Sequence, residues 1–297
     1  MSKTIAMIDT ATGPKKVLLG LIGSGIRRSS SPALHMDEAA ALGFALQYSL
    51  FDLDETPGGV GALGRLLDDA ERAGYAGLNI THPCKQIVGE YLHELSDHAK
   101  ALGAVNTVVF SKGRRFGYNT DWLGYAEAFQ RELPDANLKC VLQLGCGGAG
   151  SAIAYAMLRM GAQQLDVFDL DQAKARQMAA ALTDRFGPDR IRVVADIGNS
   201  MDRFSGLINA TPIGMDKHPG SPLAPRLLQP SMWVSEVVYF PLETELLRAA
   251  RAIGCRTVDG GGMVVFQAAE AFQLFTGVKA DAERMLERFR QSILSLP

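Results

Sequence analysis

The sequence predicts an α/β fold of two domains. Short apolar segments typical of strands alternate with helical segments along the whole chain of 297 residues, which favours mainly parallel sheets covered by helices. This length is too great for one small core and fits two domains of ordinary size. A linker rich in turn-forming residues, 133–137, separates a first strand–helix series from a second that begins at Lys139.

The composition argues against several classes of protein. A formal net charge of -2 provides no basic surface for nucleic acid or an anionic membrane. The four cysteines contain no C-x-x-C pair, so we expect reduced thiols rather than disulfides or zinc ligands. Residues 1–14 lack the features of a signal peptide, and no later stretch is long and apolar enough to cross a bilayer. We therefore expect a soluble, cytoplasmic protein.

The first series is expected to form one sheet with intervening helices. Its predicted strands cover residues 17–22, 48–53, 76–80 and 104–110. One helix is expected to start at Ser31-Pro32, with Ser31 as N-cap, and to end at Gly43. Further helices are predicted over 60–72 and 121–132, and a turn is predicted at Lys112-Gly113. The domain boundary should lie in or near the helix over 121–132.

The second series opens with a glycine-rich turn between a strand over 139–144 and a helix from about Ser151 to Met160. Gly145, Gly147 and Gly150 match G-x-G-x-x-G, the dinucleotide-binding pattern. In that pattern the glycines permit a tight turn, close approach of a pyrophosphate, and close helix–strand packing. The helix N-terminus provides N–H groups and a positive dipole end for the phosphates.

Asp169 follows the next predicted strand, about 20 residues beyond the glycines, where an acidic residue usually binds the adenosine ribose. A carboxylate there can accept hydrogen bonds from both ribose hydroxyls and would repel a 2′-phosphate, which favours NAD over NADP. The ordinary structural explanation, a cap on the following helix, suits Asp171 better than Asp169.

Lys85 and Asp121 are candidate chemical groups of the first domain. Lys85 is expected near the first turn of a helix, where the dipole opposes its charge and favours loss of its proton. A solvated surface lysine is nevertheless the commonest case, and Asp121 at another helix start could be an ordinary N-cap. Neither residue alone decides the function.

Seven ordered segments decide it together. They are Ser29–Pro32, Asn79–Lys85, Ala104–Thr107, Asn119–Asp121, Asn209–Met215, Val238–Leu247 and Met263–Ala268. This set resembles the shikimate/quinate dehydrogenase family, and the resemblance runs from about Leu19 to Gly277. Asp169 and the segment Thr-His-Pro-x-Lys-Gln, which begins at Thr81, are most similar to its NAD-linked quinate/shikimate branch. The NADP-linked biosynthetic branch usually has Asn-Arg-Thr at the end of the strand that precedes Asp169.

The resemblance implies roles for individual residues. Lys85 would be the catalytic lysine and Asp121 its aspartate partner. The substrate-binding residues would be Ser29, Ser31, Asn79, Thr81, Lys85, Asn106, Asp121, Tyr239 and Gln267. The cofactor-binding residues would be Gly145, Gly147, Gly148, Ala149, Gly150, Asp169, Thr211, Pro212, Met215, Val237 and Gly260. No metal is expected, because neither His35 nor His82 has a second ligand at metal spacing.

The expected reaction is NAD-dependent hydride transfer that interconverts shikimate, or quinate, and the 3-dehydro ketone. Lys85 would act as general acid/base, oriented by Asp121. Relatives that use quinate can carry threonine at the position of Ser31, so we expect shikimate to be the better substrate. Cys84 replaces the aromatic residue usual before the lysine, and Glu236 stands where aspartate is usual. Aromatic amino acid biosynthesis and quinate catabolism both remain open as the biological role.

Two other functions stay open. One is a dehydrogenase of an amino-substituted shikimate or quinate, and the other is a non-catalytic NAD-binding regulator, which the presence of both Lys85 and Asp121 disfavours. We expect residues 1–122, completed by helices over 260–297, to form the substrate-binding domain and 123–259 the Rossmann-type NAD-binding domain. The active site should lie between them, at the carboxyl ends of the strands. A homodimer remains open.

Overall fold

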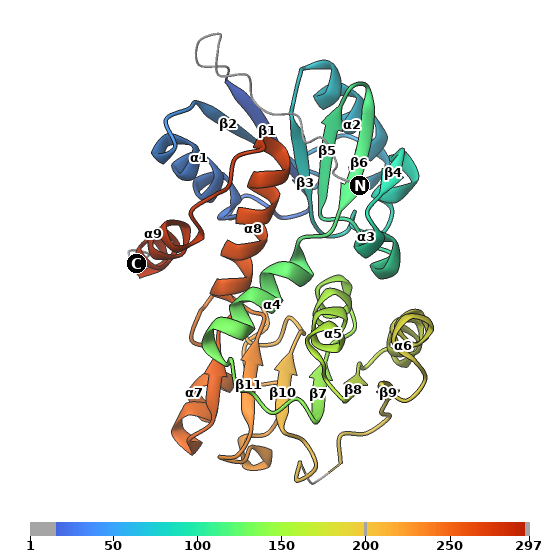
Figure 1. Ribbon diagram of the computed structural model, residues 1–297, viewed down its shortest axis with the longest axis vertical. Helices are drawn as coiled ribbons and strands as arrows, with labels where there is room; N and C mark the ends of the chain where they lie inside the picture. Colours follow the sequence, from blue (N-terminus) through green and yellow to red (C-terminus); the bar gives the residue numbers. More distant parts are fainter. Residues whose placement is uncertain (1–15, 199–200, 295–297) are drawn as a thin grey trace. The chain divides into compact units, whose positions relative to one another are not determined.

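The computed structural model describes residues 16–198 and 201–294, which form two units (Figure 1). Unit 1 contains the described residues up to Thr120 and from Val265 onward, and unit 2 is Asp121–Val264. Residues 1–14, on which the expectation about a signal peptide rests, lie outside the described residues.

Unit 1 is built on a six-stranded sheet with the order β2-β1-β3-β5-β6-β4. Its strands are β1 (Val17–Gly23), β2 (Leu46–Asp52), β3 (Gly77–Ile80), β4 (Glu94–Leu95), β5 (Thr107–Ser111) and β6 (Arg114–Tyr118). Its helices are α1 (Ser31–Ala41), α2 (Leu63–Arg72), α3 (Asp97–Leu102), the part of α8 (Gly261–Thr276) from Val265 onward, and α9 (Ala282–Leu294). Two 3-10 helices are η1 (Gly59–Ala62) and η2 (Val88–Tyr91).

The expected mainly parallel sheet is present in unit 1, except that one strand, β5, runs in the opposite direction. β1 runs parallel to β2 and β3, but β5 is antiparallel to both β3 and β6. The cause is the predicted turn at Lys112-Gly113, where both residues have positive φ (52° and 69°). A turn this short can only join antiparallel strands. As a result, the carboxyl ends of β1, β2, β3 and β6 meet the amino end of β5 at one edge of the sheet.

Other predicted boundaries shift by a few residues. The strand expected from 104 begins only at Thr107, and the helix expected over 60–72 begins as η1 before continuing as α2. The N-cap of α1 is Ser30 rather than Ser31, and it makes no capping hydrogen bond through its side chain. These errors are local, and they leave Ser31 in the first turn of α1.

Both faces of the unit 1 sheet are covered by helices. On one face, Ile22 and Leu78 pack in a core with Leu63 and Leu67 of α2. On the other, β1 and β2 contribute a second core with residues of α8, including Phe275. A Cβ added at Gly77 would lie 2.4 Å from the Phe275 ring, so glycine is what lets α8 approach the sheet so closely.

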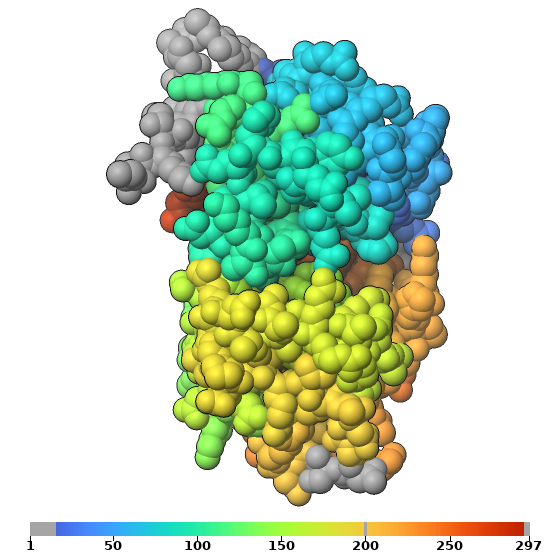
Figure 2. Space-filling model, turned by 90° about the vertical axis from the view of Figure 1, so that its right-hand side faces the viewer, coloured from blue at the N-terminus to red at the C-terminus, as the bar shows by residue number. Residues whose placement is uncertain are grey.

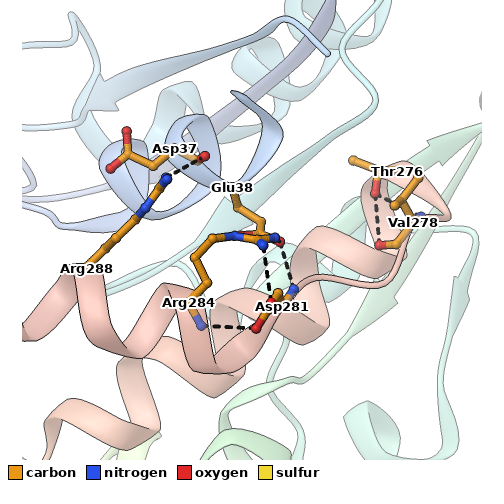
Figure 3. Close-up of polar contacts among 7 residues, drawn as sticks. All are labelled: Asp37, Glu38, Thr276, Val278, Asp281, Arg284 and Arg288. Carbon is orange, nitrogen blue, oxygen red and sulfur yellow. Dashed lines mark hydrogen bonds and ion pairs between the residues drawn. The ribbon is translucent and has the colours of Figure 1, made fainter. Parts of the chain in front are cut away.

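The C-terminal helix α9 is held to α1 by charged groups (Figure 3). The side chain of Glu38 is fully buried. Its carboxylate accepts hydrogen bonds from Arg284 Nε (3.0 Å) and Nη2 (2.7 Å) and from Asp281 N (2.7 Å). Arg288 Nη1 donates to the carbonyl oxygen of Asp37 at 2.8 Å. A buried carboxylate requires such partners, so α9 completes the environment of the helix that begins at Ser31.

Unit 2 is built on a six-stranded parallel sheet with the order β12-β11-β10-β7-β8-β9. Its strands are β7 (Cys140–Leu144), β8 (Gln164–Phe168), β9 (Ile191–Val193), β10 (Gly206–Asn209), β11 (Trp233–Glu236) and β12 (Arg256–Val258). Its helical segments are α4 (Asp121–Glu132), α5 (Gly148–Met160), α6 (Gln172–Phe186), η3 (Pro225–Leu227) and α7 (Glu245–Ile253).

This order is the doubly wound arrangement in which the chain reverses its direction of strand addition between β7 and β10. Leu142, Leu207 and Val234 of the sheet pack against Leu246 and Leu247 of α7 on one face. Helix α6 lies toward the β9 edge and contributes to the yellow surface in Figure 2. Ligands of such sheets bind at the carboxyl ends of the two strands that flank the reversal. In unit 2 those ends are Leu144 of β7 and Asn209 of β10.

Candidate active site

The predicted substrate-binding residues of unit 1 gather at the sheet edge where the carboxyl ends of β1, β3 and β6 meet the amino end of β5. The sequence-predicted residues that unit 1 contains are Ser29, Ser31, Asn79, Thr81, Lys85, Asn106 and Gln267. The predicted cofactor-binding residues all belong to unit 2, as do Asp121 and Tyr239.

Two serine hydroxyls lie together after β1. Ser29 Oγ donates to Ser31 Oγ at 3.1 Å, and the Ser31 backbone N–H donates to Ser29 Oγ at 3.2 Å. The loop before them is held by Asp52, at the end of β2, whose carboxylate accepts hydrogen bonds from Gly25 N (3.0 Å) and Ile26 N (3.1 Å). Two half-buried hydroxyls fixed side by side can bind the two oxygens of a carboxylate. The role of Asp52 in holding this loop was not predicted.

Lys85 lies in a series of turns between β3 and η2, so the predicted helix at this position is wrong. The turns are closed by hydrogen bonds from Cys84 N to Thr81 O (2.8 Å) and from Val88 N to Cys84 O (3.0 Å). Because Lys85 is not on a helix, the expected effect of a helix dipole on its proton does not apply. The backbone of this half-buried lysine is fixed, because its carbonyl oxygen accepts from Val105 N at 2.8 Å.

Cys84, which replaces the usual aromatic residue before the lysine, is fully buried in the core that includes Ile22 and Val88. Burial raises the pKa of this thiol, so it stays protonated and acts as a packing group. The core of unit 1 therefore accommodates cysteine in place of the aromatic residue.

Asn106 connects three segments of unit 1. Its Oδ1 accepts from Thr120 N at 2.8 Å, and its Nδ2 donates to Thr120 Oγ1 at 2.9 Å. Its Nδ2 also lies 3.5 Å from Gln267 Oε1, which brings a residue of α8 to the sheet edge. Thr120 directly precedes Asp121, a buried residue that begins α4. The network of Asn106 therefore fixes the backbone immediately before Asp121.

The glycine-rich turn of unit 2 shows why each glycine is needed. Gly145 has a φ of 94°, and an added Cβ would lie 2.6 Å from Ala210 O. An added Cβ at Gly150 would lie 2.3 Å from Gly145 O, whereas one at Gly147 would meet nothing within 4 Å. The turn and the packing of α5 thus require Gly145 and Gly150, and Gly147 borders open space. The N-terminus of α5, which begins at Gly148 rather than Ser151, can serve a phosphate group.

Gln143 holds this turn from within. The buried side chain donates through Nε2 to Gly145 O (2.9 Å) and to Gly150 O (2.8 Å). Sequence reasoning missed this residue. The signal that could have revealed it is a polar residue inside an otherwise apolar strand, two residues before the first glycine of the motif.

Asp169 lies at this turn. Its Oδ2 accepts a hydrogen bond from Cys146 N, inside the glycine motif, at 2.8 Å, and its Oδ1 accepts from Asp171 N at 2.8 Å. Asp171 is the N-cap of α6, where its side chain accepts from Ala173 N at 3.0 Å. The two acids thus have different roles. Asp171 caps α6, and the Asp169 carboxylate contacts the glycine-rich turn.

The loop after β10 is shaped by Asn209 and Glu236. Asn209 Oδ1 accepts from Thr211 N (3.0 Å) and Thr211 Oγ1 (2.7 Å), while its Nδ2 donates to Glu236 Oε1 at 2.9 Å. Glu236 also accepts from Thr244 Oγ1 (3.0 Å) and from Val238 N (3.0 Å). Burial raises the pKa of Glu236, and these donors oppose the shift. The longer acid at this position therefore joins the ends of β10 and β11 to the start of α7.

The remaining predicted residues of unit 2 follow β10, β11 and β12. Thr211 and Pro212 lie in the loop after Asn209, and Met215 there is 39% exposed. A Cβ at Gly260 would lie 2.5 Å from Val237 O, so the backbone after β11 requires a glycine at this position. Tyr239 is half-buried, and burial raises its pKa, which keeps the phenol protonated as a hydrogen-bond donor.

Across residues 16–198 and 201–294, no group of three or more His, Cys, Asp or Glu side chains could hold a metal ion. Among the helices of these residues, none has both the length and the apolar character needed to span a membrane.

Comparison with known proteins identifies the family. Residues 21–108 match the family model described as shikimate dehydrogenase substrate binding domain, and residues 260–288 match that of the shikimate 5′-dehydrogenase C-terminal domain. A shikimate dehydrogenase (NADP(+)) of Streptomyces avermitilis is 52% identical over 271 residues, which cover 91% of this chain and 93% of the relative. The chain belongs to the shikimate dehydrogenase family.

Relatives with NAD in their names are also similar to this chain. A quinate/shikimate dehydrogenase (NAD(+)) of Corynebacterium efficiens is 45% identical over 276 residues, which cover 92% of this chain and 97% of the relative. The solved structure of quinate dehydrogenase from Corynebacterium glutamicum in complex with NAD has a TM-score of 0.88 and 43% identity, covering 93% of this chain and all of that one. The predicted family and two-domain α/β fold are confirmed, and the protein is an oxidoreductase that uses a nicotinamide dinucleotide.

Proposed function

We propose that this oxidoreductase uses NAD to interconvert shikimate, or quinate, and the 3-dehydro ketone. The observation that carries the choice of cofactor is the Asp169 carboxylate, whose Oδ2 lies 2.8 Å from Cys146 N of the glycine-rich turn. A carboxylate at that place accepts hydrogen bonds from both adenosine ribose hydroxyls. Two unit charges 4 Å apart repel by about 4 kcal/mol at an effective dielectric constant of about 20, before solvent screening, so a 2′-phosphate is disfavoured.

The residues of unit 2 fit such a cofactor. The open space at Gly147 and the N-terminus of α5 suit the pyrophosphate, and the loop Asn209–Met215 stands on the other side of the strand reversal. We assign the cofactor to Gly145, Gly147, Gly148, Ala149, Gly150, Asp169, Thr211, Pro212, Met215, Val237 and Gly260. Unit 2 is then the NAD-binding domain and unit 1 the substrate-binding domain.

Ser29 and Ser31 would bind the substrate carboxylate, because their hydroxyls lie together at the start of α1. Asn79, Thr81, Asn106, Gln267 and Tyr239 would bind the ring hydroxyls. Hydrogen bonds from several directions fix the reacting carbon, and this placement accounts for much of the catalysis.

Lys85 and Asp121 would handle the proton. NAD, when bound, supplies the hydride acceptor. As the substrate alcohol is oxidised, its hydroxyl proton must leave, and Lys85 in its neutral form can accept that proton at Nζ. Asp121 would orient the lysine and accept a hydrogen bond from the same hydroxyl. In the reverse direction the ammonium of Lys85 returns the proton to the alkoxide oxygen.

The decisive experiment measures kcat/KM for NAD and NADP at a fixed shikimate concentration. We expect the wild type to prefer NAD by at least roughly tenfold, which corresponds to only about 1.4 kcal/mol. Asp169→Ser should weaken NAD and remove much of the preference. Asp171→Ser is the matched control, since this neighbouring acid caps α6, and it should keep the preference. A wild type that prefers NADP would overturn the cofactor assignment. Quinate, assayed in the same way, should be the poorer substrate.

A further inference from the structure

Tyr48 of β2 belongs to none of the segments that carry the family resemblance, yet its hydroxyl lies among the substrate-binding side chains. It donates a hydrogen bond to Asn79 Oδ1 at 2.8 Å. Asn79 is one of the residues proposed above to bind the substrate ring. The outer strand β2 is therefore connected to this part of the substrate site.

The sheet register explains how the tyrosine reaches so far. Tyr48 is paired with Leu19 of β1, and Leu21, two residues on, is paired with Asn79 of β3. Tyr48 thus reaches across β1 to Asn79, on the face of the sheet that packs against Ala271 and Phe275 of α8. Figure 1 shows the course of α8 in unit 1. Only a long, rigid side chain with a polar end can connect the outer strand β2 to β3 in this way.

The ring of Tyr48 is fixed by its neighbours. The His35 ring stacks on it with a centroid separation of 5.2 Å and an interplanar angle of 25°, and Phe272 stacks on His35 at 6.0 Å. Burial lowers the pKa of His35, so the imidazole is neutral and packs as a flat ring. Tyr48 itself is 8% exposed. A ring held on this side cannot swing away, so its hydroxyl is a fixed donor.

The fixed donor decides which way the Asn79 amide faces. With Oδ1 engaged by Tyr48, the amide cannot turn over without losing that hydrogen bond. Its Nδ2 donates to Asn106 O and Thr107 Oγ1 at 3.4 Å each, which are long hydrogen bonds. With Oδ1 fixed by Tyr48, Nδ2 is the group of this amide that can donate to a ring hydroxyl of the substrate.

We infer that Tyr48 is a positioning residue that fixes the orientation of the Asn79 amide toward the ring substrate. This inference rests on the proposed function, because it takes Asn79 to bind that substrate. Tyr48 touches no reacting atom in this account. Its effect is on substrate binding.

Tyr48→Phe tests the inference, because it removes the hydroxyl and keeps the ring. We expect KM for shikimate to rise by roughly five- to tenfold, the effect of one lost hydrogen bond, with kcat and the KM for NAD nearly unchanged. In an Asn79→Ala background the same substitution should have no further effect on KM. A purely structural role would act independently of Asn79.

Tyr75→Phe is the matched control, since the Tyr75 hydroxyl donates at 2.9 Å to Ser49 Oγ of β2, the strand that also carries Tyr48. It should leave KM for shikimate unchanged. If Ser29→Ala, Ser31→Ala and Asn79→Ala raise KM and Tyr48→Phe does not, the inference fails and the proposed function stands. If none of the four substitutions changes KM, the proposed substrate site itself fails. If Tyr48→Phe raises KM for shikimate equally in the wild-type and the Asn79→Ala backgrounds, the inference is also overturned.

Discussion

The buried histidine beside Tyr48 makes the stability of the protein depend on pH in a way that can be worked out. His35 is 1% exposed, and burial lowers its pKa from 6.5 to about 3. Between these values the unfolded chain binds a proton at this residue and the folded protein does not. The free energy of unfolding should therefore decrease as the pH falls through this window, and this loss is absent above pH 6.5.

The expected magnitude follows from proton linkage, which is worth about 1.4 kcal/mol for each pH unit when one state binds one proton more than the other. Proton uptake by the unfolded state becomes substantial only below pH 6.5. The change from pH 7 to pH 5 should therefore cost about 2 kcal/mol from His35 alone. His35→Phe removes the titrating group and keeps a flat ring for stacking on Tyr48 and Phe272.

The assay is urea unfolding of wild type and His35→Phe at pH 7, 6 and 5. The difference between the two proteins cancels the other titrating groups, and we expect it to change by about 2 kcal/mol in favour of the variant as the pH falls. His218→Phe, at an exposed histidine, is the control and should not change the pH slope in this way. Parallel pH dependences for wild type and His35→Phe would refute the reasoning.

Two further predictions concern the binding sites. Ser29→Ala and Ser31→Ala should each remove a hydrogen bond to the substrate carboxylate, worth about 1.5–3 kcal/mol. Each should raise KM for shikimate while kcat changes little. An unchanged KM in both variants would place the carboxylate elsewhere. Gly150→Ala should lower the melting temperature, because its Cβ would lie 2.3 Å from Gly145 O, whereas Gly147→Ala should leave melting unchanged and raise KM for NAD. Equal melting of the two glycine variants would contradict the roles assigned to them.

Local signals were enough for much of unit 2. The helix predicted over 121–132 is α4 (Asp121–Glu132), and the cap predicted at Asp171 is present. These features depend on short-range patterns, namely an acidic N-terminal residue, an apolar strand and glycines at fixed spacing. The fold therefore followed from the sequence wherever neighbouring residues determine the structure.

The errors and omissions have a different origin. Lys85 was expected on a helix because the pattern after β3 did not show that Thr81 and Cys84 close successive turns. The reversed direction of β5 was not predicted, because strand direction depends on pairing, which a hydrophobic pattern does not contain. Tyr48 was missed because its partner Asn79 is 31 residues away in the chain. Gln143 was missed because a strand pattern does not show that its side chain binds carbonyl oxygens of the turn that follows.

The central claim is that Lys85 transfers the proton during oxidation of a shikimate-type alcohol by NAD, and NADH formation after mixing with NAD and shikimate tests it most directly. We expect Lys85→Ala to lower kcat by on the order of 10² or more while NAD affinity is retained. Lys100→Ala, at an exposed lysine of α3, should keep wild-type turnover. Asp121→Asn should also lower kcat, and the double variant should lose far less than the product of the single losses. Near-normal NADH formation by Lys85→Ala would contradict the account.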